Sequence, residues 1–141
     1  MHDKVLGINL PSPMALAYIG DARHALYVRE MLVRGGISKS GSLNEAALAY
    51  VTAEAQAAAM HRIEPMLLDD EREVYKRAYN SGHLNRPKHA SAADYRAATG
   101  FEAVLGMLHL LGDEERISEL LSVAYSDNTP CGKGLTNDTE D

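Results

Sequence analysis

The chain has 141 residues, of which 45% are hydrophobic, with 11 glycines and 5 prolines, a composition typical of one globular domain rather than a disordered polypeptide. No apolar run approaches the ~20 residues that span a bilayer, and the N-terminus lacks the layout of a signal peptide, which disfavours membrane-spanning and secreted proteins. The net charge of −6 argues mildly against a nucleic-acid partner, although its uneven distribution leaves that question open.

Helical signals follow one another along the chain. Ser12 followed by Pro13 predicts a helix start, and the pair Gly35-Gly36 predicts its end at about Arg34. After a loop at 37–42, further helices are expected over 43–50, 52–67, 70–79, 92–111 and 114–125. The expected N-caps of the last three are Asp69, Ser91 and Asp113.

Strand-like alternation and internal repeats are both missing from the sequence, so we expect an all-α fold of about six to seven helices. The expected domain covers residues 1–125. The remainder, 126–141, is polar, and we expect it to be disordered. This tail contains the one cysteine, Cys131, which excludes an intrachain disulfide and fits a reducing cytoplasm.

Asp21 is an unusual residue for its helix. One apolar stripe at helical spacing predicts a core face, formed by Ile19, Ala22, Leu26 and Val33. A second stripe, to which Asp21 itself belongs, contains Met14, Ala17, Ala25 and Val28. A helix that is apolar on two sides is expected to pack on two sides. An ionised carboxylate there is costly unless it is paired, hydrogen-bonded or bound to a cation.

Glu102 stands in a similar position in the helix expected over 92–111, where it interrupts a mostly apolar stripe. Glycines lie close to both acids: Gly20, Gly100 and Gly106. A glycine inside a helix costs ~1 kcal/mol relative to alanine, so three of them require a reason. Close packing of two helices is one reason, and access for a bulky substrate is another.

Spacing alone permits two interpretations of Asp21 and Glu102. Each acid could be half-exposed or paired with an arginine, because structural ion pairs commonly account for such residues. Alternatively, the two acids could form a divalent-metal site of oxygen ligands on two packed helices. An iron or zinc site in a helical bundle, using His61 with Glu64 or Glu102 with His109, is weaker because no repeated ligand set is found.

Several segments resemble the Mini-ribonuclease III family, small bacterial relatives of ribonuclease III that keep the nuclease domain and lack the double-stranded-RNA-binding domain. The segments are "ALAYIGDA", "YVRE", "AEAQA", "EREVYKRAYN", "RPKHA" and "YRAATGFEAVLGMLHLLGDEERISEL". The similarity runs in order over roughly residues 14–125. "YIGDA" followed about 80 residues later by "TGFEAVLG" makes the resemblance specific.

The resemblance implies an all-α fold, a two-fold homodimer, Mg²⁺-dependent cleavage of double-stranded RNA and a role in the maturation of 23S ribosomal RNA. It implies that Asp21 and Glu102 are the catalytic and metal-binding acids. Two positions differ from full-length ribonuclease III, since Ala17 and Thr99 stand where that enzyme has further acids. This thinner set of acids leaves open whether one metal ion or two act at the site.

Positive charge is concentrated between residues 76 and 96, where five basic residues face one acid, whereas residues 113–141 contain eight acids and two basic residues. We expect the first segment to contact RNA phosphates, through Lys76, Arg77, Asn80, Arg86, Lys88, His89 and Arg96. The alternative is that these residues form a basic loop that is exposed to solvent and binds nothing.

Two other functions remain open: a ribonuclease III-like module that binds structured RNA without cutting it, and a helical adaptor that binds protein.

Overall fold

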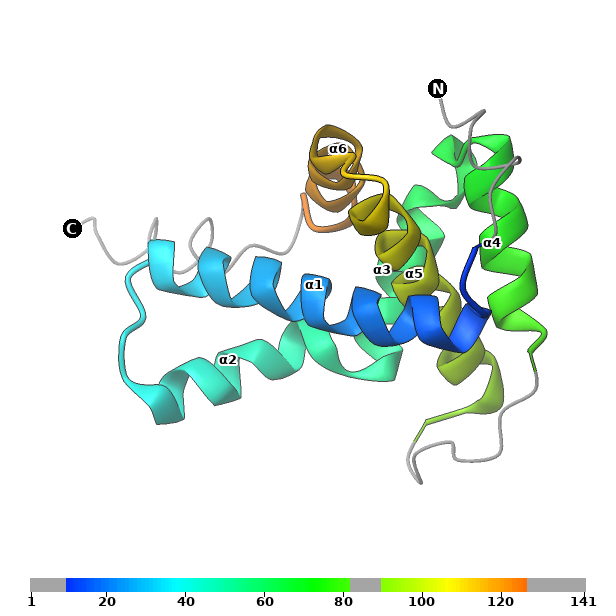
Figure 1. Ribbon diagram of the computed structural model, residues 1–141. Coiled ribbons are helices and arrows are strands. Elements are labelled where there is room, and N and C mark those ends of the chain that lie inside the picture. The colour runs from blue at the N-terminus through cyan, green and yellow to red at the C-terminus, as the bar shows by residue number, and fades with distance from the viewer. Residues whose placement is uncertain (1–9, 82–89, 127–141) are drawn as a thin grey trace.

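A computed structural model of the chain describes residues 10–81 and 90–126, and this part is entirely helical (Figure 1). The elements are α1 (Pro13–Arg34), α2 (Ser40–Val51), α3 (Ala53–Ile63), a 3₁₀ turn η2 (Glu64–Met66), α4 (Asp69–Tyr79), α5 (Ala92–Leu110) and α6 (Glu114–Ala124). The predicted all-α class is therefore confirmed, and the number of helices in the described ranges agrees with the expectation.

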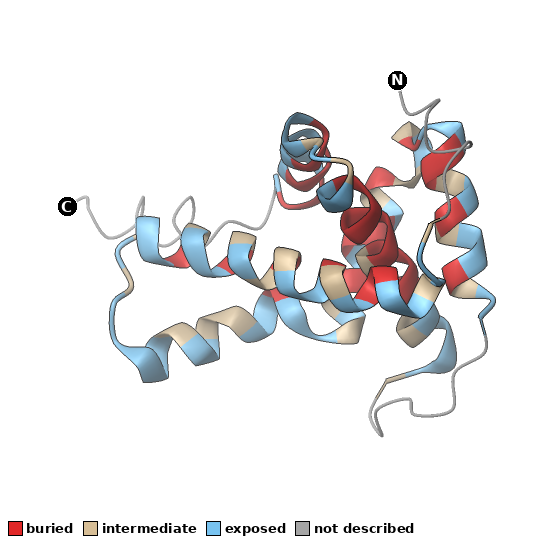
Figure 2. Ribbon diagram, viewed as in Figure 1, coloured by how far each residue is buried: buried red, intermediate tan, exposed pale blue. Residues whose placement is uncertain are grey.

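Helix α5 is the centre of the fold. From Ala97 to Leu108 every residue except Glu102 is buried, and Figure 2 shows this buried band surrounded by the other helices. Helices α1, α3, α4 and α6 all pack directly against α5. Glu102 is therefore an acidic residue within the most deeply buried of the described helices.

The glycines near the two acids are explained by close helix crossing. A Cβ atom on Gly20 of α1 would overlap the carbonyl oxygen of Glu102 on α5, and one on Gly106 of α5 would overlap the carbonyl oxygen of Leu16 on α1. The two helices thus cross with their main chains in contact. Gly100 allows close packing against a different helix, because a Cβ there would overlap the ring of Tyr75 on α4.

Three of the predicted helix starts are confirmed by side-chain caps. The Ser12 hydroxyl accepts a hydrogen bond from the Ala15 amide at 3.1 Å. The Ser91 hydroxyl accepts one from the Asp94 amide at 3.0 Å. The Asp113 carboxylate caps α6 by accepting one from the Arg116 amide at 3.1 Å. Each cap satisfies an amide that the first turn of a helix otherwise leaves without an acceptor.

The cap predicted at Asp69 is wrong. Helix α4 begins at Asp69 itself, and Leu68 occupies the N-cap position. Glu71 performs the capping instead, because its Oε1 accepts a hydrogen bond from the Leu68 amide at 2.9 Å. The same carboxylate is fully buried and is held by Arg116 of α6, whose Nε and Nη2 each donate at 2.9 Å. This paired charge joins α4 to α6 in the interior.

Two predicted boundaries also differ. Helix α2 begins at Ser40, inside the segment expected to be a loop, because serine and glycine are tolerated in a first helical turn. Helix α3 ends at Ile63 rather than continuing to 67. Pro65 has no amide hydrogen to extend the α-helix, so the chain continues as the 3₁₀ turn η2.

Apart from Ser126, the predicted tail at 126–141 lies outside the described residues, as does Cys131. Arg86, Lys88 and His89 of the expected basic segment also lie outside them. Among the described helices, none combines the length and the apolar character that a membrane crossing would need.

The helix crossing gives a direct test. Gly20→Ala should lower the free energy of unfolding by about 3 kcal/mol or more, because the new methyl group meets main chain that cannot move aside. The matched control is Gly41→Ala in α2, where nothing lies within 4 Å of the added Cβ and where alanine should stabilise the helix by up to about 1 kcal/mol. Urea unfolding measures both variants. Equal effects of the two substitutions would contradict the proposed backbone contact.

Candidate active site

Asp21 lies at the middle of α1, one residue after the glycine that contacts α5. Because the crossing buries Gly20 and the α5 side of the helix, the next residue is placed at the rim of that contact, and Asp21 is exposed. It is the side chain on α1 that combines a negative charge with direct access from solvent beside the crossing. The carboxylate is therefore available to a ligand.

Glu102 meets Asp21 from α5. Its side chain is half-buried and makes a hydrogen bond to the Asp21 carboxylate. Burial, followed by the hydrogen bond and negative charge of Asp21, raises the pKa of Glu102 to about 9. Two carboxyl groups in contact cannot both ionise cheaply, so Glu102 keeps its proton at neutral pH unless a cation takes its place.

The donors at this site fit a magnesium ion. Two carboxylates supply hard oxygen ligands, and Mg²⁺ in proteins commonly uses one or two carboxylates while water and substrate phosphate fill the other positions. In the described ranges no cluster of three or more histidine, cysteine, aspartate or glutamate side chains is arranged to hold a metal. The structure therefore gives no support to the histidine-rich bundle site: His61 lies 3.9 Å from Glu64, with both side chains largely exposed.

A buried amide acts on Glu102 from α3. Gln56 is buried, and its side chain lowers the pKa of Glu102, against the larger effects of burial and of Asp21. Gln56 is not among the site residues predicted from the sequence. Its signal is the single polar side chain in the buried, alanine-rich face of "AEAQAAAM", a pattern that gives no hint of the partner.

His24 lies behind the site rather than in it. Its ring is buried, its Nε2 lies 2.6 Å from the Tyr125 hydroxyl, and its Nδ1 lies 3.2 Å from Gln56 Nε2. Burial lowers the pKa of His24 to about 4, with the Asp21 charge acting weakly in the opposite direction. The ring is therefore neutral at pH 7 and belongs to the structural support of the site.

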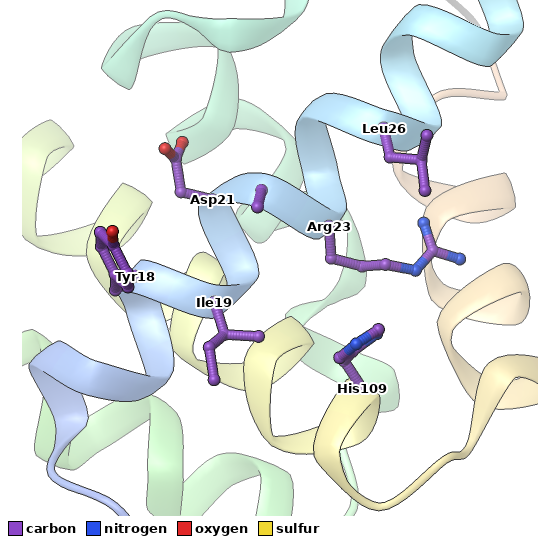
Figure 3. Close-up of a pocket in the computed structure, with 7 residues that line it drawn as sticks. Tyr18, Ile19, Asp21, Arg23, Leu26 and His109 are labelled. Carbon is purple, nitrogen blue, oxygen red and sulfur yellow. The ribbon is translucent and has the colours of Figure 1, made fainter.

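An exposed apolar surface adjoins Asp21 on α1, and it contains a hollow of about 520 Å³. Figure 3 shows Tyr18, Ile19, Arg23 and Leu26 projecting from α1, and His109 projecting from α5 below Arg23. We call Tyr18, Ile19, Ala22 and Leu26 the α1 apolar surface. Arg23 is fixed there by an ion pair with Glu114 at 2.8 Å.

The prediction of which side of α1 faces the core is wrong. The stripe of Ile19, Ala22, Leu26 and Val33, expected to face the core, is largely exposed, with Leu26 at 51% and Val33 at 56%. The core side of α1 is instead formed by Leu16, Ala17, Gly20, His24, Val28 and Leu32. Part of the stripe that contains Asp21 thus packs in the monomer, because α5 approaches the helix through glycine.

The basic residues that are described lie on either side of the segment 82–89. Lys76, Arg77 and Asn80 are at the C-terminal end of α4, and Arg96 is near the start of α5; all four are exposed. The Asn80 amide donates a hydrogen bond to the Lys76 carbonyl at 2.9 Å and so also closes the end of α4. These four exposed side chains are accessible to a polyanion such as RNA.

Comparison with known proteins gives consistent matches. Residues 14–113 match the family model described as Ribonuclease III domain. The chain is 44% identical over 117 residues to Mini-ribonuclease 3 of Symbiobacterium thermophilum, covering 83% of this chain and 89% of that protein. It is 42% identical to Mini-ribonuclease 3 of Brevibacillus brevis, covering 84% and 88%. The fold is similar to a crystal structure of a Fusobacterium nucleatum protein, with a TM-score of 0.76, 28% identity and coverage of 83% and 90%.

His24 predicts how stability depends on pH. In the unfolded chain it takes up a proton near pH 6.5, but in the folded chain only near about pH 4, so the unfolded state binds more protons between these values. Stability should therefore fall as the pH decreases from about 6.5 to 4, by up to about 3 kcal/mol from this residue. Urea unfolding at a series of pH values measures the effect. A His24→Gln variant should show a shallower slope over this range, and an unchanged slope would exclude His24 as its origin.

Proposed function

The chain belongs to the Mini-ribonuclease III family of endoribonucleases, and from this premise we propose that it cleaves double-stranded RNA at a Mg²⁺ site formed by Asp21 and Glu102. The observation that carries the proposal is the contact between these two carboxyl groups on crossing helices. Such a pair is costly without a cation and provides the oxygen ligands that Mg²⁺ prefers.

The two acids have different surroundings and therefore different roles. When bound, Mg²⁺ supplies a water that is nucleophilic at neutral pH and stabilises the leaving oxygen of the phosphodiester. Asp21 is exposed, so it can hold the ion from the side on which RNA arrives and orient the attacking water. Glu102 is half-buried and completes the protein's share of the ligands from the α5 side. Phosphate oxygens of the RNA would fill the coordination positions that the two carboxylates leave open.

The basic residues suit a duplex of RNA. Double-stranded RNA is recognised mainly through its phosphates and 2′-hydroxyl groups rather than its bases. We propose that Lys76, Arg77, Asn80 and Arg96 contact this backbone, together with Arg86, Lys88 and His89. Charged and amide side chains at exposed positions are the groups that such contacts need.

The proposal also includes the biological substrate and the compartment in which it is cleaved. We assign the cleavage to the maturation of 23S ribosomal RNA in the cytoplasm, the role that resemblance to the Mini-ribonuclease III family implies. The single cysteine fits that reducing compartment.

A homodimer completes the arrangement. A duplex has two antiparallel strands, and a two-fold dimer would present one acid pair to each of them. The α1 apolar surface is exposed in the single chain and adjoins Asp21, so we propose that it packs against its copy in a second chain. The stripe of Met14, Ala17, Ala25 and Val28, which contains Asp21, is less suited to face a second chain, since Ala17 and Val28 are already buried within one chain.

The reaction is tested with a labelled RNA duplex, Mg²⁺ and three samples: wild type, Asp21→Asn, and wild type with EDTA. Only the first should cut, with Asp21→Asn reduced at least about a thousandfold because a ligand of the ion is lost. Retention of duplex RNA on a filter without cutting by the wild type would favour the non-catalytic RNA-binding module instead.

The dimer is tested by placing a charge on the α1 apolar surface. Leu26→Glu should convert the protein to a monomer in sedimentation velocity, because the carboxylate would be buried unpaired in the interface. Leu68→Glu is the control, since Leu68 is exposed to a comparable extent (41%) but lies at the start of α4. A wild-type protein that sediments as a monomer at micromolar concentration would contradict the proposed interface.

A further inference from the structure

Arg29 continues the exposed side of α1 on which the α1 apolar surface lies. It follows Leu26 by three residues and Ala22 by seven, so all three side chains leave the helix on the same side. Arg29 is exposed, whereas Val28 and Leu32 beside it are buried. The exposed side of α1 thus changes from apolar to cationic one turn beyond Leu26.

Arg29 has no anionic partner in the described part of the chain. Arg23, one and a half turns earlier on α1, is ion-paired with Glu114 at 2.8 Å, and its side chain is only 14% exposed. Arg29, by contrast, takes part in no ion pair within residues 10–81 and 90–126. Its guanidinium group is therefore available to an anion, and this group binds phosphate through two parallel hydrogen bonds.

The orientation of the proposed dimer decides which acid pair Arg29 approaches. Across a two-fold axis at the α1 apolar surface, α1 meets its own copy in a more nearly parallel or a more nearly antiparallel direction. A parallel pairing would place Arg29 beside the Arg29 of the second chain, and like charges repel. An antiparallel pairing places it beside the half of α1 that contains Asp21, where the charge is opposite. Charge complementarity therefore favours the antiparallel pairing.

In the antiparallel pairing Arg29 approaches the acid pair of the second chain. Ala22 is at the middle of the α1 apolar surface. With the two-fold axis there, Arg29, seven residues after Ala22, lies opposite Ala15, seven residues before it. Ala15 is exposed and small, which leaves space for a long side chain. Six residues separate Ala15 from Asp21, about 9 Å along the helix. An extended arginine side chain and one bound phosphate group together bridge such a separation.

We propose that Arg29 acts in trans: it binds a phosphate of the RNA strand that lies at the acid pair of the second chain. The inference rests on the proposed reaction and dimer, and it adds to each site a residue that its own chain does not supply. Two acids repel the phosphodiester that has to approach them, and a cation close by offsets this repulsion. Each site is then complete only in the dimer.

The test uses heterodimers in which only one acid pair is intact. Two chains with different affinity tags are co-expressed, and the mixed dimer is captured on both tags. The first heterodimer has Asp21→Asn in one chain and Arg29→Ala in the other. The second has both substitutions in one chain and a wild-type partner. Nicking of a labelled RNA duplex with Mg²⁺ is compared with a reference heterodimer of Asp21→Asn and wild type.

The first heterodimer should nick RNA as fast as the reference, because the intact acid pair receives Arg29 from the Asp21→Asn chain. The second should be slower by about tenfold or more in kcat/KM, because a charge-assisted phosphate contact at the intact site is lost. The opposite order of the two rates would mean that Arg29 acts on its own chain and would overturn the proposal. Equal rates in all three heterodimers would also overturn it.

The matched control is Arg34→Ala. Arg34 is an exposed arginine in the last turn of the same helix, and its position five residues after Arg29 turns it to another side of α1. Placed in the same chain as Asp21→Asn and opposite a wild-type partner, Arg34→Ala should leave the nicking rate at the reference level. A loss equal to that of the second heterodimer would contradict a specific contact by Arg29.

RNA binding without cleavage separates this inference from the proposed reaction. Duplex affinity is measured in EDTA at a series of salt concentrations, for wild type and for Arg29→Ala in both chains. The slope of log affinity against log salt should become shallower by about two, one for each phosphate contact removed. An unchanged slope would overturn the contact. A wild-type protein that leaves RNA intact in Mg²⁺ but shows this change of slope would overturn the proposed reaction and support the contact.

Discussion

The direct contact between the main chains of α1 and α5 is the constraint on which the rest of the structure depends. Gly20 and Gly106 let each helix approach the carbonyl oxygens of the other, at a distance that any side chain would prevent. Asp21 and Glu102 are then brought together because one follows the contact glycine and the other supplies the carbonyl that the glycine meets. The same crossing turns the opposite side of α1 outward. The acid pair and the α1 apolar surface are therefore two results of one packing contact.

The site contains groups that lower the stability of the folded chain, namely paired carboxyl groups and buried polar side chains. Two carboxyl groups meet at the edge of the most buried helix, and the pKa of Glu102 rises accordingly. Behind them, Gln56, His24 and Tyr125 are buried polar groups joined to one another by hydrogen bonds. Elsewhere the interior uses the paired charge of Glu71 and Arg116 to join helices. Within residues 10–81 and 90–126, by contrast, no ion pair joins Asp21 or Glu102 to a basic side chain, and this agrees with the metal ion proposed for the site.

Local features of the sequence predicted the fold well and the packing less well. Ser12, Ser91 and Asp113 cap helices as expected, because a cap depends only on the next three residues. The orientation of α1 could not be predicted in the same way, since both of its sides are apolar and only the glycine contact decides which one faces α5. Asp21 and Glu102 were found through their apolar context and the family resemblance. Gln56 was missed because its hydrogen-bond partner, His24, is distant in the sequence.

The glycine crossing also separates the geometry of the site from the composition of the core. The spacing of α1 and α5 at the acids is set by main-chain atoms, which are the same whatever side chains surround them. Substitutions among neighbouring core residues such as Val28 or Val104 would change stability first and the spacing of the carboxylates only slightly. Such a site tolerates sequence drift around it. Gly20 and Gly106 are the exceptions, because a methyl group at either position would overlap main-chain atoms of the other helix.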